Sequence, residues 1–176
     1  TFKEFEVSYF VEPHAAAYAM QIFGRTPEMI QKNKKLLGVP YQWNKYSQIA
    51  VREYVSGAME NTTATVHGDF VLKNPNQIVD NNDDAVIAHE LFHHWFGDLV
   101  TCESWANLPL NESFADYSEY LWSSHKYGDD EGDWTALKAL ENYLYEATTK
   151  QVPLIRYYHE NREDMFDSHS YSKGGR

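Results

Sequence analysis

Apolar and polar residues alternate in the first part of the chain, a pattern that predicts short β-strands. The alternation is clear in TFKEFEVSYFV (1–11), which reads as a strand and is compatible with a sheet edge. It recurs in SQIAVREYV (47–55), and TTATVHGDFVL (62–72) is rich in β-branched residues until Gly68 interrupts it. We therefore expect a small sheet in this part of the chain.

Helical spacing of apolar residues marks four other segments. TPEMIQKNKKLLGVP (26–40) predicts a helix with Thr26 as N-cap and a stop at Gly38. The other predicted helices run from Asp83 or Asp84 to Gly97, from Glu112 to near Gly128, and from 132 to 149, starting near Asp133. Strands followed by helices predict an α+β domain.

The apolar run AVIAHELFHHWFGDLV (85–100) carries titratable side chains that a purely structural helix does not need. His89 and His93 are four positions apart, so on a helix they project from one face, about 40° apart around the axis. Two imidazoles in this arrangement can chelate one ion, and His-Glu-x-x-His is a spacing that binds zinc. The adjacent His94 points about 100° away from His93 and is interpreted as structural.

Two histidines leave a catalytic zinc short of its usual three protein ligands. Glu112 supplies a third candidate, because it opens the next helical segment and only 18 residues separate it from His93. The intervening residues leave room for one helix to end and another to return against it. We therefore expect His89, His93 and Glu112 to bind one Zn²⁺ per chain.

Glu90 lies between the two histidines on the same predicted helix, beside the metal-binding face. A carboxylate there can take a proton from water whose pKa the metal has lowered to about 7, and pass it to a leaving amine. The predicted chemistry is metal-assisted hydrolysis with Glu90 as general base.

At this point the sequence resembles a known family. His89-Glu90-x-x-His93 with Glu112 is similar to the gluzincin peptidases, and GAMEN at 57–61 narrows the resemblance to the aminopeptidase N family. The blocks YQWNKYSQIAVREYVSGAMEN, HELFHHWFGDLVT, WANLPLNESFA and YSKGG follow in the family's order. The resemblance implies a thermolysin-like α+β catalytic domain, with a small mixed sheet followed by helices.

The resemblance also implies roles for residues outside the zinc motif. Glu60 would bind the free α-amino group of a peptide, and Tyr171 of the YSKGG block would donate a hydrogen bond to the developing oxyanion. The implied substrate-binding residues are Gly57, Ala58, Met59, Glu60 and Asn61. His169, two residues before Tyr171, is interpreted as structural.

The chain departs from the family in two respects. Family members carry a β-rich domain before this region and a helical domain after it, so we expect 1–176 to be one partial catalytic domain with flanking domains missing. Within it, 1–80 would be strand-rich and contain GAMEN, and 81–176 would be helical and contain the zinc site. Pro109 stands where the family usually has an aromatic residue, and Ser113 where it usually has glycine.

Composition narrows the possible partners. The net charge of −11 and the pI of about 5.1 argue against a nucleic-acid partner. The chain has neither an apolar run of 18 residues nor a signal-peptide pattern, so we expect a soluble domain whose compartment stays open. Its single cysteine, Cys102, excludes an internal disulfide. Trp95, Trp105 and Trp122 are expected in the core.

The leading functional hypothesis is a zinc aminopeptidase that acts on peptides with a free amino terminus. One branch of the family combines this activity with epoxide hydrolysis, although Ala58 departs from the glycine usual in that branch. A non-catalytic peptide-binding module and an endopeptidase remain as alternatives. The preferred amino-terminal residue is not predicted.

Overall fold

The computed structural model describes residues 4–176 of the chain. Contacts between residues divide it into two compact units, one extending to His94 and the other comprising Trp95–Arg176. The predicted strand at 1–11 lies partly outside the described residues, because 1–3 are not described. The two units are described in turn.

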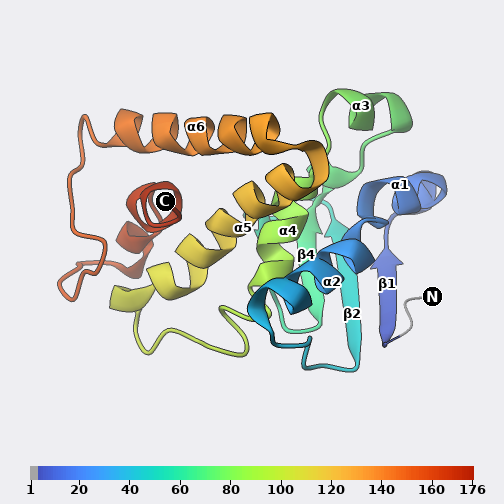
Figure 1. The fold of residues 1–176 in the computed structure, drawn as a ribbon, viewed down its shortest axis with the longest axis horizontal. Coiled ribbons are helices and arrows are strands. Elements are labelled where there is room, and N and C mark those ends of the chain that lie inside the picture. Colours follow the sequence, from blue (N-terminus) through green and yellow to red (C-terminus); the bar gives the residue numbers. More distant parts are fainter. Residues whose placement is uncertain (1–3) are drawn as a thin grey trace. The chain divides into compact units, whose positions relative to one another are not determined.

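The first unit contains a four-stranded sheet in the order β1-β2-β4-β3 (Figure 1). Its strands are β1 (Glu6–Phe10), β2 (Lys45–Val51), β3 (Ala58–Met59) and β4 (Ala64–Gly68). β1, β2 and β4 are parallel to one another, whereas β3 is antiparallel to β4. The sheet is therefore small and mixed, as predicted, and β1 lies at one edge.

The central strand β2 is largely buried, which is typical of a strand with a parallel partner on each side. The sequence predicted that this strand would continue to Val55, which is wrong. The strand ends at Val51, the backbone turns through Glu53 at a φ of 51°, and the Val55 side chain is 96% exposed. The alternation of apolar and polar residues continues beyond Val51, but the residues after it have no neighbouring strand to pair with.

Helices of the first unit connect and cover the strands. The helix α2 (Thr26–Leu37) ends at Gly38, whose φ of 68° lies in the left-handed region that favours glycine, so this predicted stop is confirmed. It packs against α4 (Asp84–Phe92), as Figure 1 shows. The remaining helical segments of this unit are η1 (Pro13–Tyr18), α1 (Ala19–Phe23), η2 (Asp69–Val71) and α3 (Pro75–Asp80).

The sequence predicted Thr26 as the N-cap of α2, and this prediction is wrong. Arg25 occupies that position, and Thr26 is the first helical residue. The hydroxyl of Thr26 donates to the carbonyl of Phe23 at 2.7 Å and accepts from the amide nitrogen of Gln48 at 2.7 Å. Thr26 therefore joins the start of α2 to the buried side of the central strand.

The start of α4 agrees with the sequence in position but not in the capping group. Asp83 occupies the N-cap position, yet its side chain makes no capping hydrogen bond. Instead, the side-chain oxygen of Asn82 accepts a hydrogen bond from the backbone amide of Asp84 at 3.1 Å. An asparagine thus satisfies one of the free amides at the helix start.

The helix α4 ends at Phe92, and not at Gly97 as the sequence predicted. The amide of His94 bonds to the carbonyl of Leu91, three residues back, which tightens the last turn. The chain then turns, and the amide of Gly97 bonds to the carbonyl of Val100. The apolar run continues beyond Phe92 because Trp95 is buried, whereas Leu99 and Val100 at its end are exposed.

The second unit is helical. Its elements are η3 (Trp105–Asn107), α5 (Pro109–Tyr127), α6 (Asp129–Glu146), the 3₁₀ turn η4 (Arg162–Met165) and the π-helical segment η5 (His169–Lys173). α6 packs along α5, and η5 contacts both helices. Figure 1 shows α6 in orange and the carboxyl-terminal segment in red.

The two long helices begin three residues earlier than predicted. Pro109 occupies the first helical position of α5, where its fixed φ fits and a backbone N–H is not needed. The helix therefore begins at Pro109 and not at Glu112. It ends at Gly128 as predicted, with a φ of 102° at that glycine. α6 starts directly afterwards with acidic residues, which are favourable at the positive end of a helix.

The tryptophan predictions are confirmed in part. Trp95 and Trp122 are buried, whereas Trp105 is 41% exposed and the prediction for it was wrong. Trp105 lies on the short 3₁₀ segment and packs against the ring of Phe166 rather than inside a core. Among the described residues, no helix is both long and apolar enough to cross a membrane.

Candidate active site

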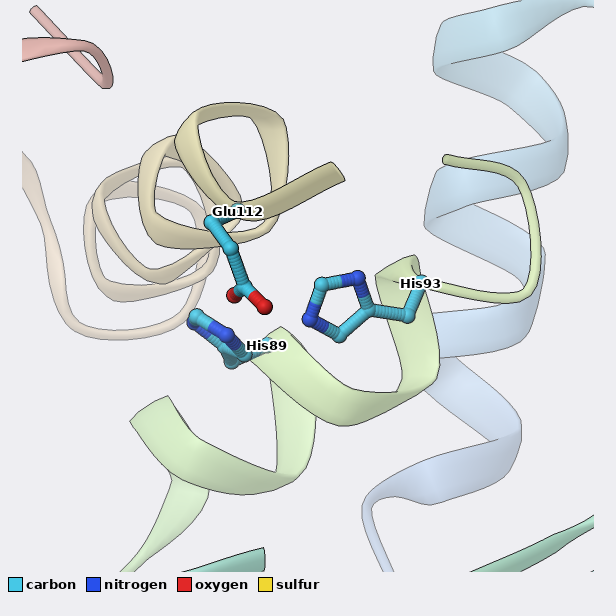
Figure 2. Close-up of side chains that lie close together, drawn as sticks. All are labelled: His89, His93 and Glu112. Atoms are coloured by element: carbon cyan, nitrogen blue, oxygen red, sulfur yellow. The ribbon is translucent and has the colours of Figure 1, made fainter. Parts of the chain in front are cut away.

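The two histidines of the zinc motif lie together at the end of α4. His89 is in its last turn and His93 is its C-terminal cap. Both are buried, and their ring centroids are 4.8 Å apart with the ring planes at 75°. Figure 2 shows both imidazoles projecting from the same side of the helix. This is the arrangement that the four-residue spacing predicted.

Glu60 and Glu90 also come together in the first unit. Glu90 is buried on α4, and Glu60 follows β3 directly. One potential ligand atom from each of Glu60, Glu90 and His93 lies within 4.8 Å of the other two. The structure therefore places the glutamate of GAMEN beside the zinc motif, although about 30 residues separate them in the sequence.

The GAMEN segment forms a short edge of the sheet. Ala58 and Met59 constitute β3, paired with His67 and Val66 of β4. Within the part of the chain that the structure describes, no strand pairs with the other side of β3. An unpaired edge offers backbone donors and acceptors to an extended peptide.

His94 has a structural position, in agreement with its interpretation from the sequence. Its Nε2 accepts a hydrogen bond from the backbone amide of Thr63 at 3.0 Å. The ring contacts three aromatic side chains of the same unit, those of Tyr41, Trp43 and Tyr46. Burial lowers the pKa of His94 to about 4, so the ring is neutral at physiological pH and can accept.

His67 of β4 is a buried histidine whose hydrogen-bond partner the sequence did not reveal. It is fully buried, and its Nε2 lies 3.0 Å from the side-chain oxygen of Gln48. Because the amide nitrogen of Gln48 donates to Thr26, the oxygen must accept, so His67 Nε2 carries the proton. Burial lowers the pKa of His67 to about 4. The residue supports the sheet, and among the described residues it belongs to no cluster that could hold a metal ion.

Glu112 lies in the second unit, in the first turn of α5, and is buried (Figure 2). The amino-terminal end of a helix stabilises a negative charge, which favours the ionised carboxylate that a metal requires. The preceding residue, Asn111, accepts a hydrogen bond from the amide of Cys102 at 3.1 Å and ties the incoming loop to this turn.

Tyr171 is in the second unit, within the π-helical segment η5, and is partly exposed. Its amide donates to the carbonyl of Asp167 at 3.1 Å, and its carbonyl accepts from the amide of Gly175 at 2.9 Å. Single π-helical turns occur often at functional sites, because they displace one side chain from the regular helical path.

A buried ionic cluster supports η5, and the sequence analysis missed it. Arg156 donates to both oxygens of Asp167, at 2.6 and 3.0 Å, and Lys150 lies 2.5 Å from the same carboxylate. Burial alone would raise the pKa of Asp167, but the bonds from Arg156, Lys150 and the amide of Ser170 outweigh it and lower the pKa to about 2. These contacts join residues up to 17 positions apart, which no local pattern indicates.

His169 belongs to the same support, as expected from the sequence. It is fully buried, and its Nδ1 lies 3.1 Å from a carboxylate oxygen of Glu146 at the end of α6. The ring packs edge-on against Tyr143. Glu146, Asp167 and His169 could together resemble a metal site, but Arg156 and Lys150 already neutralise Asp167.

The residue types of the predicted ligands, two in the first unit and one in the second, suit zinc. Two neutral imidazoles and one carboxylate are the ligands of a common type of catalytic zinc centre, which keeps a position open for water. His89 and His93 offer nitrogens from one helical face, and Glu112 offers an oxygen at a helix start. A soft metal would instead require thiolates, and Cys102 lies on a loop outside this set.

Comparison with known proteins gives a consistent result. The model of the peptidase family M1 domain matches residues 19–176. The chain is 35% identical over 172 residues to aminopeptidase N of Canis lupus familiaris, covering 89% of this chain and 17% of that protein. It is 36% identical over 160 residues to probable aminopeptidase 1 of Saccharolobus solfataricus, covering 84% of this chain and 20% of that protein.

Solved structures agree with the sequence matches. The structure of yeast LTA4 hydrolase in complex with bestatin aligns with a TM-score of 0.83 and 26% identity, covering 96% of this chain and 27% of that one. The M1 zinc metallopeptidase from Deinococcus radiodurans aligns with a TM-score of 0.64 and 28% identity, covering 86% of this chain and 30% of that one. The chain spans about a fifth of the length of the curated relatives it matches.

Proposed function

The chain belongs to peptidase family M1, and we propose that it is the catalytic part of a zinc-dependent aminopeptidase that removes residues from the amino termini of peptides. The observation that carries this proposal is the proximity of Glu60, Glu90 and His93 within one unit. It combines an anionic group for a substrate amine with a base beside a metal-binding histidine. The names of the relatives support the same activity.

In this proposal, His89, His93 and Glu112 hold one zinc ion, the set of ligands that the sequence predicts. His89 and His93 contribute neutral imidazoles from α4, and Glu112 contributes a carboxylate from α5. A bound zinc ion would act as a Lewis acid and lower the pKa of water. Protein side chains perform the remaining tasks, which are proton transfer, substrate placement and oxyanion stabilisation.

Glu90 is the proposed general base. Its carboxylate is buried on the same helix as both histidines, so it can accept a proton from the attacking water and donate it to the departing amine. A rigid helix fixes the distance between base and ligands. Glu90 therefore contributes to chemistry rather than to metal binding.

Glu60 is the proposed anchor for the substrate's free amino group. A carboxylate near a second carboxylate attracts an ammonium ion, and Glu60 and Glu90 are close neighbours. The edge strand β3 leads directly into Glu60, so a peptide that pairs with this edge would present its first residue to the carboxylate. A binding site for the terminal ammonium would restrict cleavage to the first peptide bond.

Tyr171 is the proposed donor to the oxyanion. Its phenol can stabilise the charge that develops on the carbonyl oxygen, a contribution that commonly amounts to about 3 kcal/mol. Its segment is held by the buried cluster around Asp167, which limits movement of the backbone. A fixed donor does not have to reorganise during the reaction.

The test measures zinc and turnover in the same preparations of the complete protein. We expect Glu90→Gln to retain the zinc content of the wild type and to hydrolyse an aminoacyl anilide about 10²- to 10⁴-fold more slowly, because the amide cannot take a proton. Glu160→Gln, at an exposed loop position, serves as the control and should retain full activity. Wild-type turnover in Glu90→Gln would refute the assigned base, and a wild type without zinc or turnover would refute the proposed function.

A further inference from the structure

Ser170, the residue before Tyr171, is held at all three of its polar groups. Its amide donates to Asp167 at 3.0 Å, and its hydroxyl accepts from Arg156 at 2.7 Å. Its carbonyl accepts a 2.6 Å hydrogen bond from the hydroxyl of Ser113. Ser113 and Ser170 are both buried, so water does not compete for these bonds.

The hydrogen bond from Ser113 connects Ser170 to a residue that is distant in the sequence, unlike the other two bonds. Asp167 and Arg156 lie near Ser170 in the sequence, whereas Ser113 is 57 residues away in the first turn of α5. It directly follows Glu112, the proposed third zinc ligand. One helical turn therefore carries a candidate ligand and also fixes the backbone that leads into Tyr171.

Gly174 packs directly against the Ser113 side chain. A Cβ placed on Gly174 would lie 2.0 Å from the Ser113 hydroxyl oxygen and 2.9 Å from the Ser113 Cβ. The φ of Gly174 is −66°, so space rather than backbone conformation requires glycine there. The neighbouring Gly175 is less tightly enclosed, because its Cβ would lie 2.8 Å from a carboxylate oxygen of Asp116 and 3.1 Å from the Ser113 carbonyl. The two glycines allow η5 to lie against α5.

We propose that Ser113 is a positioning residue for Tyr171, acting through its hydrogen bond to the carbonyl of Ser170. The inference rests on the proposed role of Tyr171 in the reaction. Asp167 and Arg156 hold the amide and hydroxyl of Ser170, and Ser113 fixes its carbonyl. The peptide unit that enters Tyr171 thus has a single orientation, which fixes the Cα–Cβ bond from which the phenol extends.

The first measurement separates kcat from KM in the complete protein. Ser113→Ala should lower kcat roughly tenfold with little change in KM, since it removes one buried hydrogen bond that orients a group acting in the transition state. Ser118→Ala is the matched control. Ser118 is also buried on α5, but its hydroxyl donates to Ala115 of the same helix at 2.7 Å, so kcat should stay near the wild-type value.

A double-mutant cycle then tests whether Ser113 acts through Tyr171. In a Tyr171→Phe background, which lacks the phenol hydroxyl, Ser113→Ala should cause no further loss of kcat. An equal loss in both backgrounds would overturn the proposal, because Ser113 would then act independently of the phenol. A rise in KM alone would overturn it as well.

Hydrogen exchange provides a measurement that needs no turnover. Ser113→Ala should accelerate amide exchange in peptides covering 168–175, while Ser118→Ala should leave their exchange unchanged. Unchanged exchange in Ser113→Ala would overturn the proposal even if the protein is an active peptidase. Conversely, accelerated exchange in a protein without peptidase activity would retain the link between Ser113 and this segment and refute only the proposed function.

Discussion

The backbone amide of Thr63 donates a 3.0 Å hydrogen bond to Nε2 of His94. Thr63 has a φ of 65°, which is unusual for a residue with a side chain, and it lies in the turn that connects β3 with β4. The bond therefore links the residue after the zinc motif to the turn that follows GAMEN. It holds the GAMEN segment and the zinc motif in a fixed position relative to each other.

Replacement of His94 should reveal the contribution of this bond. His94→Phe retains an aromatic ring but removes the acceptor, and we expect the free energy of unfolding to fall by about 1–3 kcal/mol because the amide of Thr63 loses its partner. His94→Gln restores an acceptor and should lose less. Urea unfolding of both variants measures the difference. A smaller loss in His94→Phe than in His94→Gln would show that ring packing, and not the bond, is the main contribution.

His67 should make the stability depend on pH. Its pKa is about 4 in the folded protein, below the ordinary value of 6.5, so the unfolded chain takes up a proton first as the pH falls. The stability from the neutral ring is present above pH 6.5, is lost progressively towards pH 4, and changes little further below that. The loss amounts to about 3 kcal/mol.

The measurement for His67 compares unfolding free energies at pH 7 and pH 4 in the wild type and in His67→Gln. The glutamine can still donate to Gln48 but does not titrate. The free energy of unfolding should therefore decrease between pH 7 and pH 4 by about 3 kcal/mol less in the variant than in the wild type. If the free energy of unfolding changed equally with pH in the wild type and in His67→Gln, the result would contradict a buried neutral ring at His67.

Local patterns in the sequence predicted much of the candidate site. The four-residue spacing of His89 and His93 was sufficient to place both rings on one face, because helix geometry fixes that relationship. The stop at Gly38 and the break at Gly68 followed from glycine and turn chemistry. The resemblance of GAMEN to a family motif led to Glu60, which periodicity alone would not have selected.

Long-range contacts determined what the sequence could not predict. The bond between Ser113 and Ser170 and the pairing of Arg156 with Asp167 depend on how separate segments meet. α4 ends before Gly97 because its last turn is tightened by local bonds, although apolar residues continue beyond it. Trp105 was assigned to the core from its residue type, but on its short 3₁₀ segment it is 41% exposed.

The proposed ligands predict a specific response of metal content. His89→Ala, His93→Ala and Glu112→Ala should each reduce the zinc content well below one ion per chain, because two remaining ligands cannot close the coordination shell. Elemental analysis after dialysis measures the content, and Glu90→Gln is the control that should retain zinc. Stoichiometric zinc in any one alanine variant would exclude that residue as a ligand.

The central claim is that the site recognises a free amino terminus, and Glu60 provides the most direct test. The measurement is kcat/KM for an aminoacyl anilide and for its acetylated form, on the complete wild-type protein and on Glu60→Ala. A charge-assisted bond to the ammonium contributes about 1.5–3 kcal/mol, so the wild type should prefer the free amine by roughly tenfold to a hundredfold. Glu60→Ala should lose that preference, hydrolyse the acetylated substrate at its former rate and retain zinc. Equal losses on both substrates, or efficient wild-type cleavage of the acetylated one, would contradict the account.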